Sequence, residues 1–164
     1  MKDLRTSLAM VKRRKQRGQS LVEFALTILF TFLLFVGMLE MIFLLYAYNT
    51  LANAAKEGVR YAIVHGTGNT QCSGPGLPLG SPAIICPDLT GANVQTVVTN
   101  FARLSMQSGA TVVVDYNPNS ANVALCNIPG CMVQVRVSQI YHPFFGLGWP
   151  SVTLYAAADG RIMN

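Results

Sequence analysis

Charged residues are scarce in this chain of 164 residues, making up 12% of it against 51% hydrophobic residues. The net charge of +5 is concentrated in the first 18 residues, which hold seven of the twelve Lys and Arg and one Asp and so sum to +6. The remaining 146 residues sum to −1. A body without a basic face has nothing to hold phosphates, so a nucleic-acid partner is excluded. The length allows one small domain.

Residues typical of catalytic sites are also few. His65 and His142 are the only histidines, and neither lies in a metal-binding or nucleophile motif. No Gly-x-Ser-x-Gly, phosphate-binding loop or dinucleotide-binding sequence occurs. We therefore predict that the protein is not an enzyme and has no cofactor and no small-molecule substrate.

A long apolar run is the dominant feature of the sequence. Between Leu21 and Ala47 only Glu23 and Glu40 are charged. The run exceeds the roughly 20 residues that span the hydrocarbon core of a bilayer. Basic residues crowd its N-terminal side, so the positive-inside rule places the N terminus in the cytoplasm and everything after Tyr48 outside.

All four cysteines follow the apolar run, which indicates an oxidising compartment; they are Cys72, Cys86, Cys126 and Cys131. Three pairings exist in principle. We favour Cys72 with Cys86 and Cys126 with Cys131, because each pair closes a short loop rich in Pro and Gly. Zinc is the alternative, but C-x13-C and C-x4-C without a nearby His match structural zinc sites poorly, so we expect no metal.

Helical periodicity continues beyond the apolar run. Small and apolar residues recur at helical spacing from Tyr46 to Val64, so this half is amphipathic. Because no proline occurs in this part of the chain, one helix is expected from about Gln19 to Val64. Thr67–Pro87, rich in Gly and Pro, is expected to form a surface loop.

A second helix is predicted between Val94 and Leu104, where apolar residues again recur at helical spacing. Thr90 or Asn93 is the expected N-cap. Gly109 is the expected stop.

Three β-rich runs follow, with short connections that suit an antiparallel sheet; they are Thr111–Tyr116, Met132–Tyr141 and Val152–Ala158. The sequence thus predicts an α+β, disulfide-bonded fold. Its long N-terminal helix, transmembrane in the first half and amphipathic in the second, packs on a small antiparallel sheet with a second helix. The aromatic loop Tyr141–Pro150 is a contact patch if it is exposed, and otherwise caps the end of the sheet as part of the core.

Glu23 stands at the edge of the apolar run, where a carboxylate is costly unless it is compensated. The simplest explanation is a capping box, Ser20-x-x-Glu23, at the start of a helix. A capping box does not account for Gly18 and the basic residues just before it.

The sequence Arg17–Phe24, RGQSLVEF, resembles the processing site of type IV prepilins. There, prepilin peptidase cuts after the glycine and a glutamate stands at position five of the product. Together with Asn53–Ala62, NAAKEGVRYA, it resembles the TadE-like pseudopilins of tight-adherence (Flp) pilus systems. The resemblance implies processing between Gly18 and Gln19 and a role in assembly for Glu23, which would pair with the new amine of a neighbouring chain. Cyclisation of Gln19 to pyroglutamate would instead leave Glu23 to backbone N–H groups.

The resemblance further implies a minor pilin or pseudopilin of the bacterial inner membrane, later pilus-associated or at the cell surface. Its partners would be the membrane, prepilin peptidase, other pilins or pseudopilins and the assembly platform. The chain would divide into a basic cytoplasmic leader (1–18), a transmembrane and assembly helix (19–47) and an extracytoplasmic pilin-like domain (48–164). One alternative is an uncleaved single-pass membrane protein with an extracytoplasmic disulfide-bonded binding domain. Another is a secreted protein cut after Ala54, in the A-x-A pattern Ala52-Asn53-Ala54.

Overall fold

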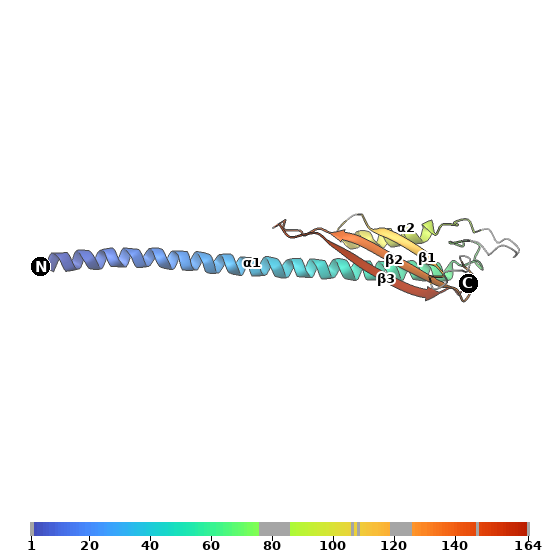
Figure 1. Ribbon diagram of the computed structural model, residues 1–164, viewed down its shortest axis with the longest axis horizontal. Helices are drawn as coiled ribbons and strands as arrows, with labels where there is room; N and C mark the ends of the chain where they lie inside the picture. Colours follow the sequence, from blue (N-terminus) through green and yellow to red (C-terminus); the bar gives the residue numbers. More distant parts are fainter. Residues whose placement is uncertain are drawn as a thin grey trace. The chain divides into compact units, whose positions relative to one another are not determined.

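The computed structural model describes residues 2–75, 86–105, 107, 109–118, 126–146 and 148–163, with side chains from residue 18 onward. Its elements are α1 (Lys2–Val64), α2 (Ala92–Ala102), the 3-10 turn η1 (Arg103–Ser105), β1 (Thr111–Tyr116), β2 (Met132–Tyr141) and β3 (Val152–Arg161) (Figure 1). The fold is α+β, as the sequence predicts. By its internal contacts the chain divides into two units, Met1–Ile42 and Phe43–Asn164.

Helix α1 ends at Val64 as expected, but it begins at Lys2. The expected start near Gln19 is therefore wrong. Residues 2–17 contain no proline and are mostly Lys, Arg, Leu, Met, Ala and Gln, which favour helix. A single glycine at position 18 costs a helix about 1 kcal/mol relative to alanine, which is too little to end it.

Among the described residues, the segment Gly18–Val64 of α1 is long and apolar enough to cross a membrane. In the first unit its large apolar side chains stand out from the helix; Phe24, Phe30 and Phe32 are each 65% exposed. A continuous apolar surface of this kind is unfavourable in water and is stable when lipid or other apolar helices cover it.

The second unit contains a three-stranded antiparallel sheet in the order β1-β2-β3. Strands β1 and β2 have the predicted bounds, whereas β3 continues past Ala158 to Arg161. The extension exists because β2 offers a partner along its whole length, so that Arg161 pairs with Met132. Strand pairing here overrides the low strand propensity of Asp159 and Gly160.

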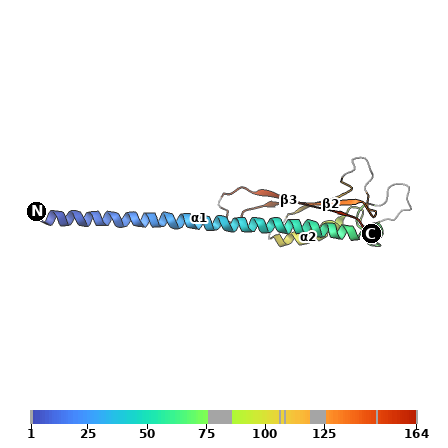
Figure 2. The ribbon, with the colours of Figure 1, turned by 90° about the horizontal axis from the view of Figure 1, so that it is seen from below.

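The core of the second unit lies between the sheet on one side and α1 and α2 on the other (Figures 1 and 2). Small residues on α1 are fully buried in it, among them Ala54, Ala55 and Ala62. At Gly58 the approach is closest: a Cβ there would lie 2.3 Å from Val98 Cγ2 of α2 and 3.2 Å from Val135 Cγ1 of β2. The predicted packing of the small-residue stripe on the sheet is confirmed.

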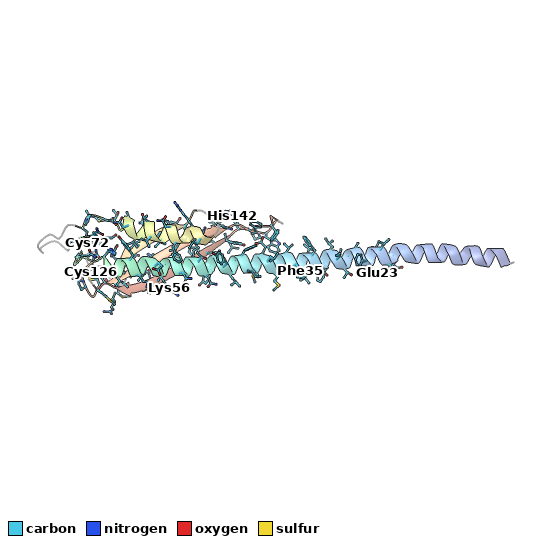
Figure 3. The ribbon with its side chains drawn as sticks, turned by 180° about the vertical axis from the view of Figure 1, so that it is seen from behind. Glu23, Phe35, Lys56, Cys72, Cys126 and His142 are labelled. Carbon is cyan, nitrogen blue, oxygen red and sulfur yellow. A yellow bond between two sulfur atoms is a disulfide. The ribbon has the colours of Figure 1, made fainter. Side chains whose placement is uncertain are left out.

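Two disulfides close the loops at one end of the second unit (Figure 3). Cys72 is bonded to Cys86, and Cys126 to Cys131. These are the pairings that the loop sequences favour. With all four sulfurs bonded to one another, no thiolate is left to hold a zinc ion.

Gly58→Leu should lower the free energy of unfolding of the second unit by about 1–3 kcal/mol or more, because the added side chain must displace the β-branched Val98 or Val135 from a filled core. Asn53→Leu is the matched control, since it adds the same side chain at an exposed position of α1. Thermal unfolding of the full chain in detergent, followed by circular dichroism, measures both. Equal melting temperatures for the two variants would contradict the close approach at Gly58.

Candidate processing and assembly site

Gly18 lies inside α1, with its backbone continuous with the helix on both sides. The residue is exposed, and a Cβ placed on it would meet nothing within 4 Å. Nothing in the described part of the chain therefore covers the Gly18–Gln19 peptide bond.

Glu23 lies one helical turn after Gln19 on the exposed surface of α1 (Figure 3). The Gln19 side-chain amide, through Nε2, donates a hydrogen bond of 3.3 Å to Glu23 Oε1. The Thr27 hydroxyl donates one of 2.8 Å to the Glu23 carbonyl oxygen. The structure thus places Gln19 next to Glu23, within one chain and before any cleavage.

The capping box expected for Ser20 and Glu23 is not formed in the uncleaved chain. Both residues stand in the interior of α1, where backbone N–H groups are already bonded to the carbonyls of the preceding turn. A capping box needs the free N–H groups of a helix start. The two carboxylates of the apolar run also differ, since Glu23 is exposed and Glu40 is only 4% exposed.

The second block, Asn53–Ala62, has two different faces. Its inner face supplies the fully buried alanines and Gly58. On its outer face Arg60 Nη1 lies 3.0 Å from Glu57 Oε1, and Lys56 is exposed beside them. Such an exposed pair contributes little to stability. The outer charges border a groove of about 490 Å³ that also reaches Phe101 and Asp159.

Residues 18–60 match the family described as TadE-like protein. The similarity covers the N-terminal part of the chain, which is called the TadE-like region below. It begins at Gly18, contains Glu23 and includes most of the second block. No curated protein and no solved structure matches the chain.

Beyond the TadE-like region, Asp88 is the residue that the sequence analysis missed. Its carboxylate accepts hydrogen bonds from the backbone N–H groups of Ala92 (3.0 Å) and Asn93 (2.8 Å), and so caps the start of α2. Thr90 and Asn93, the expected N-caps, do not have that role. Gly91 occupies the N-cap position with a left-handed φ of 73°, and Asp88 reaches the helix start from beyond it.

Helix α2 also ends earlier than expected. It stops at Ala102 and tightens into η1, so Gly109 is not its stop. The N–H of Arg103 bonds to the carbonyls of Phe101 and Thr99, and the bond to Thr99 is the last α-helical one before η1.

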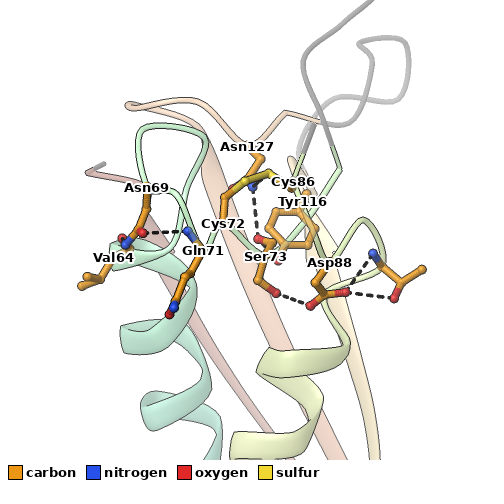
Figure 4. The surroundings of a disulfide bond; sticks show 10 residues. Val64, Asn69, Gln71, Cys72, Ser73, Cys86, Asp88, Tyr116 and Asn127 are labelled. Carbon is orange, nitrogen blue, oxygen red and sulfur yellow. Dashed lines mark hydrogen bonds between the residues drawn. A yellow bond between two sulfur atoms is a disulfide. The ribbon is translucent and has the colours of Figure 1, made fainter. Parts of the chain in front are cut away.

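Ser73 links Asp88 to the disulfide Cys72–Cys86 (Figure 4). Its hydroxyl donates to Asp88 Oδ2 at 2.5 Å. Its carbonyl oxygen accepts bonds from the Tyr116 hydroxyl (2.9 Å) and from Asn127 Nδ2 (3.1 Å). This largely buried network ties the loop after α1 to α2 and β1. The arrangement is that of a rigid scaffold, in which Ser73 is fully buried.

The network shifts the pKa of two groups. Burial by itself raises the pKa of Asp88, but hydrogen bonds from Ser73 and from the backbone N–H groups of Asn93 and Ala92 outweigh it and lower the pKa to about 2. Burial raises the pKa of Tyr116 to about 12, with a further contribution from the negative charge of Asp88. Asp88 is therefore a firmly ionised capping residue.

The part of the chain that the structure describes contains no cluster of three or more His, Cys, Asp or Glu residues that could hold a metal ion. His65 stacks on Tyr61 with ring centroids 3.9 Å apart, and His142 is exposed in the loop after β2. The histidines thus have local packing or surface positions.

Asp88→Ala should lower the free energy of unfolding by about 1 kcal/mol at neutral pH, because the cap of α2 is lost. The folded-state pKa of Asp88, about 2, lies below the ordinary value of 3.8. The stabilisation is therefore complete above 3.8 and disappears as the pH falls through about 2. Denaturant unfolding of both chains across this pH range should show their difference shrinking towards acid.

Asp159→Ala is the control for Asp88, since Asp159 accepts a bond from Gln134 Nε2 on the exposed sheet surface. It should change stability much less. If Thr90→Ala or Asn93→Ala lowered the free energy of unfolding more than Asp88→Ala does, the cap would be Thr90 or Asn93, as first expected, and not Asp88.

Proposed function

We propose that this protein is a minor pilin or pseudopilin that takes part in assembling a tight-adherence pilus after prepilin peptidase removes residues 1–18. The observation that carries the proposal is the TadE-like match that begins at Gly18, on a helix with an exposed apolar surface and with Glu23 five residues on. The role is one of assembly rather than catalysis.

The exposed apolar surface of α1 supports this proposal because it can be covered in two ways. In the membrane, lipid chains cover it. In a fibre, the helices of neighbouring subunits would cover it instead, and each large side chain that stays out of water contributes about 1.5–3 kcal/mol. A chain that moves from one setting to the other needs no refolding of its helix.

Gln19 and Glu23 support a role for processing in assembly. Cleavage after Gly18 would turn Gln19 into the first residue, with a charged α-amino group one turn from Glu23. Inside an apolar bundle an unpaired carboxylate is heavily penalised, so pairing with the amine of a neighbouring chain sets the register of the subunits. If Gln19 cyclises to pyroglutamate, the amine is lost, and Glu23 would accept hydrogen bonds from backbone N–H groups instead.

The charge distribution supports a cytoplasmic leader (1–18), a membrane and assembly helix (19–47) and an extracytoplasmic domain (48–164) in the bacterial inner membrane. Both disulfides fall in the outer part, in keeping with an oxidising compartment. The partners in this proposal are prepilin peptidase, other pilins or pseudopilins and the pilus assembly platform.

Gly18→Val should abolish processing, because a branched side chain does not fit a tight cleavage pocket. The mass of the intact protein and of its N-terminal peptide, from cells with active prepilin peptidase, measures this. The natural chain should begin at Gln19 or its cyclised form, and the variant should keep its leader. Thr27→Val, which puts the same side chain further along α1, should be processed normally.

Other N termini would contradict this processing. A natural chain that keeps its leader in those cells would be an uncleaved membrane protein with an external binding domain. A chain that begins at Ala55 would be a secreted protein.

Glu23→Ala should still be processed but should fail to support pilus assembly. Electron microscopy of cells in which the variant is the only copy counts the pili. Glu57→Ala, which removes an exposed carboxylate outside the apolar run, should leave the count unchanged. Glu23→Gln distinguishes charge pairing from hydrogen bonding. Cells with this variant should lack pili if the negative charge is needed, and should form pili if hydrogen bonds to backbone N–H groups suffice. Normal piliation with Glu23→Ala would leave only a helix-capping effect of about 1 kcal/mol.

A further inference from the structure

The loop that joins β2 to β3 exposes its aromatic side chains. Phe144 is 77% exposed, Trp149 45% and Phe145 38%, whereas Tyr141, at the end of β2, is 4% exposed. These three rings are therefore exposed, as a contact patch requires, whereas Tyr141 belongs to the core. Residues 142–151 include no Asp, Glu, Lys or Arg.

A hydrogen-bonded support holds the base of this loop. The side-chain amide of Gln107 pairs with the backbone of His142: Gln107 Nε2 donates to the His142 carbonyl at 2.8 Å, and the His142 N–H donates to Gln107 Oε1 at 3.0 Å. The Gln107 carbonyl in turn accepts a bond of 2.7 Å from Gln139 Nε2. Gln139 also accepts a bond of 2.9 Å from the Ser105 hydroxyl, and both residues are buried. Because the base is fixed, little entropy is lost when the exposed rings bind something.

The loop lies against α1 near the end of the apolar run. The rings of Phe144 and Phe43 have centroids 5.7 Å apart, and Phe145 packs edge-on against Phe144 at 5.5 Å. About 22 residues separate the start of the run, Leu21, from Phe43. As helix they measure roughly 33 Å, which matches the hydrocarbon thickness of about 30 Å. Phe43 is thus placed where a spanning helix would leave the lipid.

We propose that the β2–β3 loop is a second membrane contact, which rests in the outer interfacial layer of the bilayer through Phe144, Phe145 and Trp149. Aromatic rings are favoured at this depth, and Trp in particular combines an apolar ring with a polar N–H group. A loop without charged side chains enters the interface without desolvating an ion. The contact would hold the second unit against the membrane until the chain leaves for the pilus. It rests on the membrane span and not on cleavage.

Trp149 is the only tryptophan of the chain, so its fluorescence reports on this loop alone. We would reconstitute the full chain in phosphatidylcholine vesicles and purify it by flotation. Phospholipids brominated near the headgroup should quench Trp149 strongly, and those brominated near the chain ends should quench it weakly. Emission should shift to the blue relative to free tryptophan, and aqueous iodide on both sides of the bilayer should have little access.

Two variants sharpen the test. Phe144→Ser combined with Phe145→Ser should lose the quenching by brominated lipid and gain access to iodide. Tyr155→Ser removes a ring that is 70% exposed on β3, on the sheet face turned away from the helices, and should leave the Trp149 signal unchanged. Both replace exposed aromatic residues with serine.

Three outcomes would overturn the proposal. Trp149 open to iodide and insensitive to brominated lipid would place the loop in water. Protection from both quenchers would mean that protein, such as a second copy of the chain, covers it. If the chain does not float with the vesicles, the result would contradict both the membrane span and the loop contact. By contrast, a failure of processing after Gly18 would contradict the proposed function and leave this inference standing.

Discussion

The close approach of α1 to the sheet at Gly58 determines how the second unit is built. Because no side chain intervenes, Val98 of α2 and Val135 of β2 both reach the helix backbone, and the buried alanines on either side extend the contact along α1. Larger residues in this stripe would hold the three elements apart and leave cavities between them. The two halves of α1 therefore differ in composition, with bulky exposed residues in the first half and small buried ones where the helix meets the sheet.

Much of this architecture could be predicted because the signals are local. Runs rich in β-forming residues mark β1 and β2, helical spacing marks α1 up to Val64, and short loops rich in Pro and Gly select the two disulfides. The features that the sequence analysis predicted wrongly depend on contacts between distant parts of the chain or on weak local signals. Asp88 caps α2 only because Gly91 takes a left-handed conformation and Ser73, far away in the sequence, binds the same carboxylate. Likewise, β3 extends to Arg161 because β2 runs beside it.

The relative positions of the candidate site residues could be predicted for a different reason. Gly18, Gln19 and Glu23 lie within one and a half turns of a helix, so their spacing in sequence directly gives their spacing in space. The start of α1 was misplaced because the leader itself favours helix, and composition shows no boundary at Gly18. The sequence also could not show whether the side chains of the aromatic loop are buried or exposed. The same rings suit a buried cap or an exposed patch, and only the packing of Tyr141 inward and Phe144 outward separates the two.

The continuity of α1 through Gly18 gives Glu23 a reason to stand where it does. In the uncleaved helix, the N–H groups of residues 19–22 bond to the carbonyls of residues 15–18. Removing residues 1–18 would take away all of these acceptors at once and leave a cluster of donors, with a positive charge and the positive end of the helix dipole, in an apolar surrounding. Unpaired donors of this kind are costly away from water. A carboxylate one turn away, on the same chain or on a neighbour, could satisfy them, so in the proposed function cleavage itself creates the unpaired donors that Glu23 would bind.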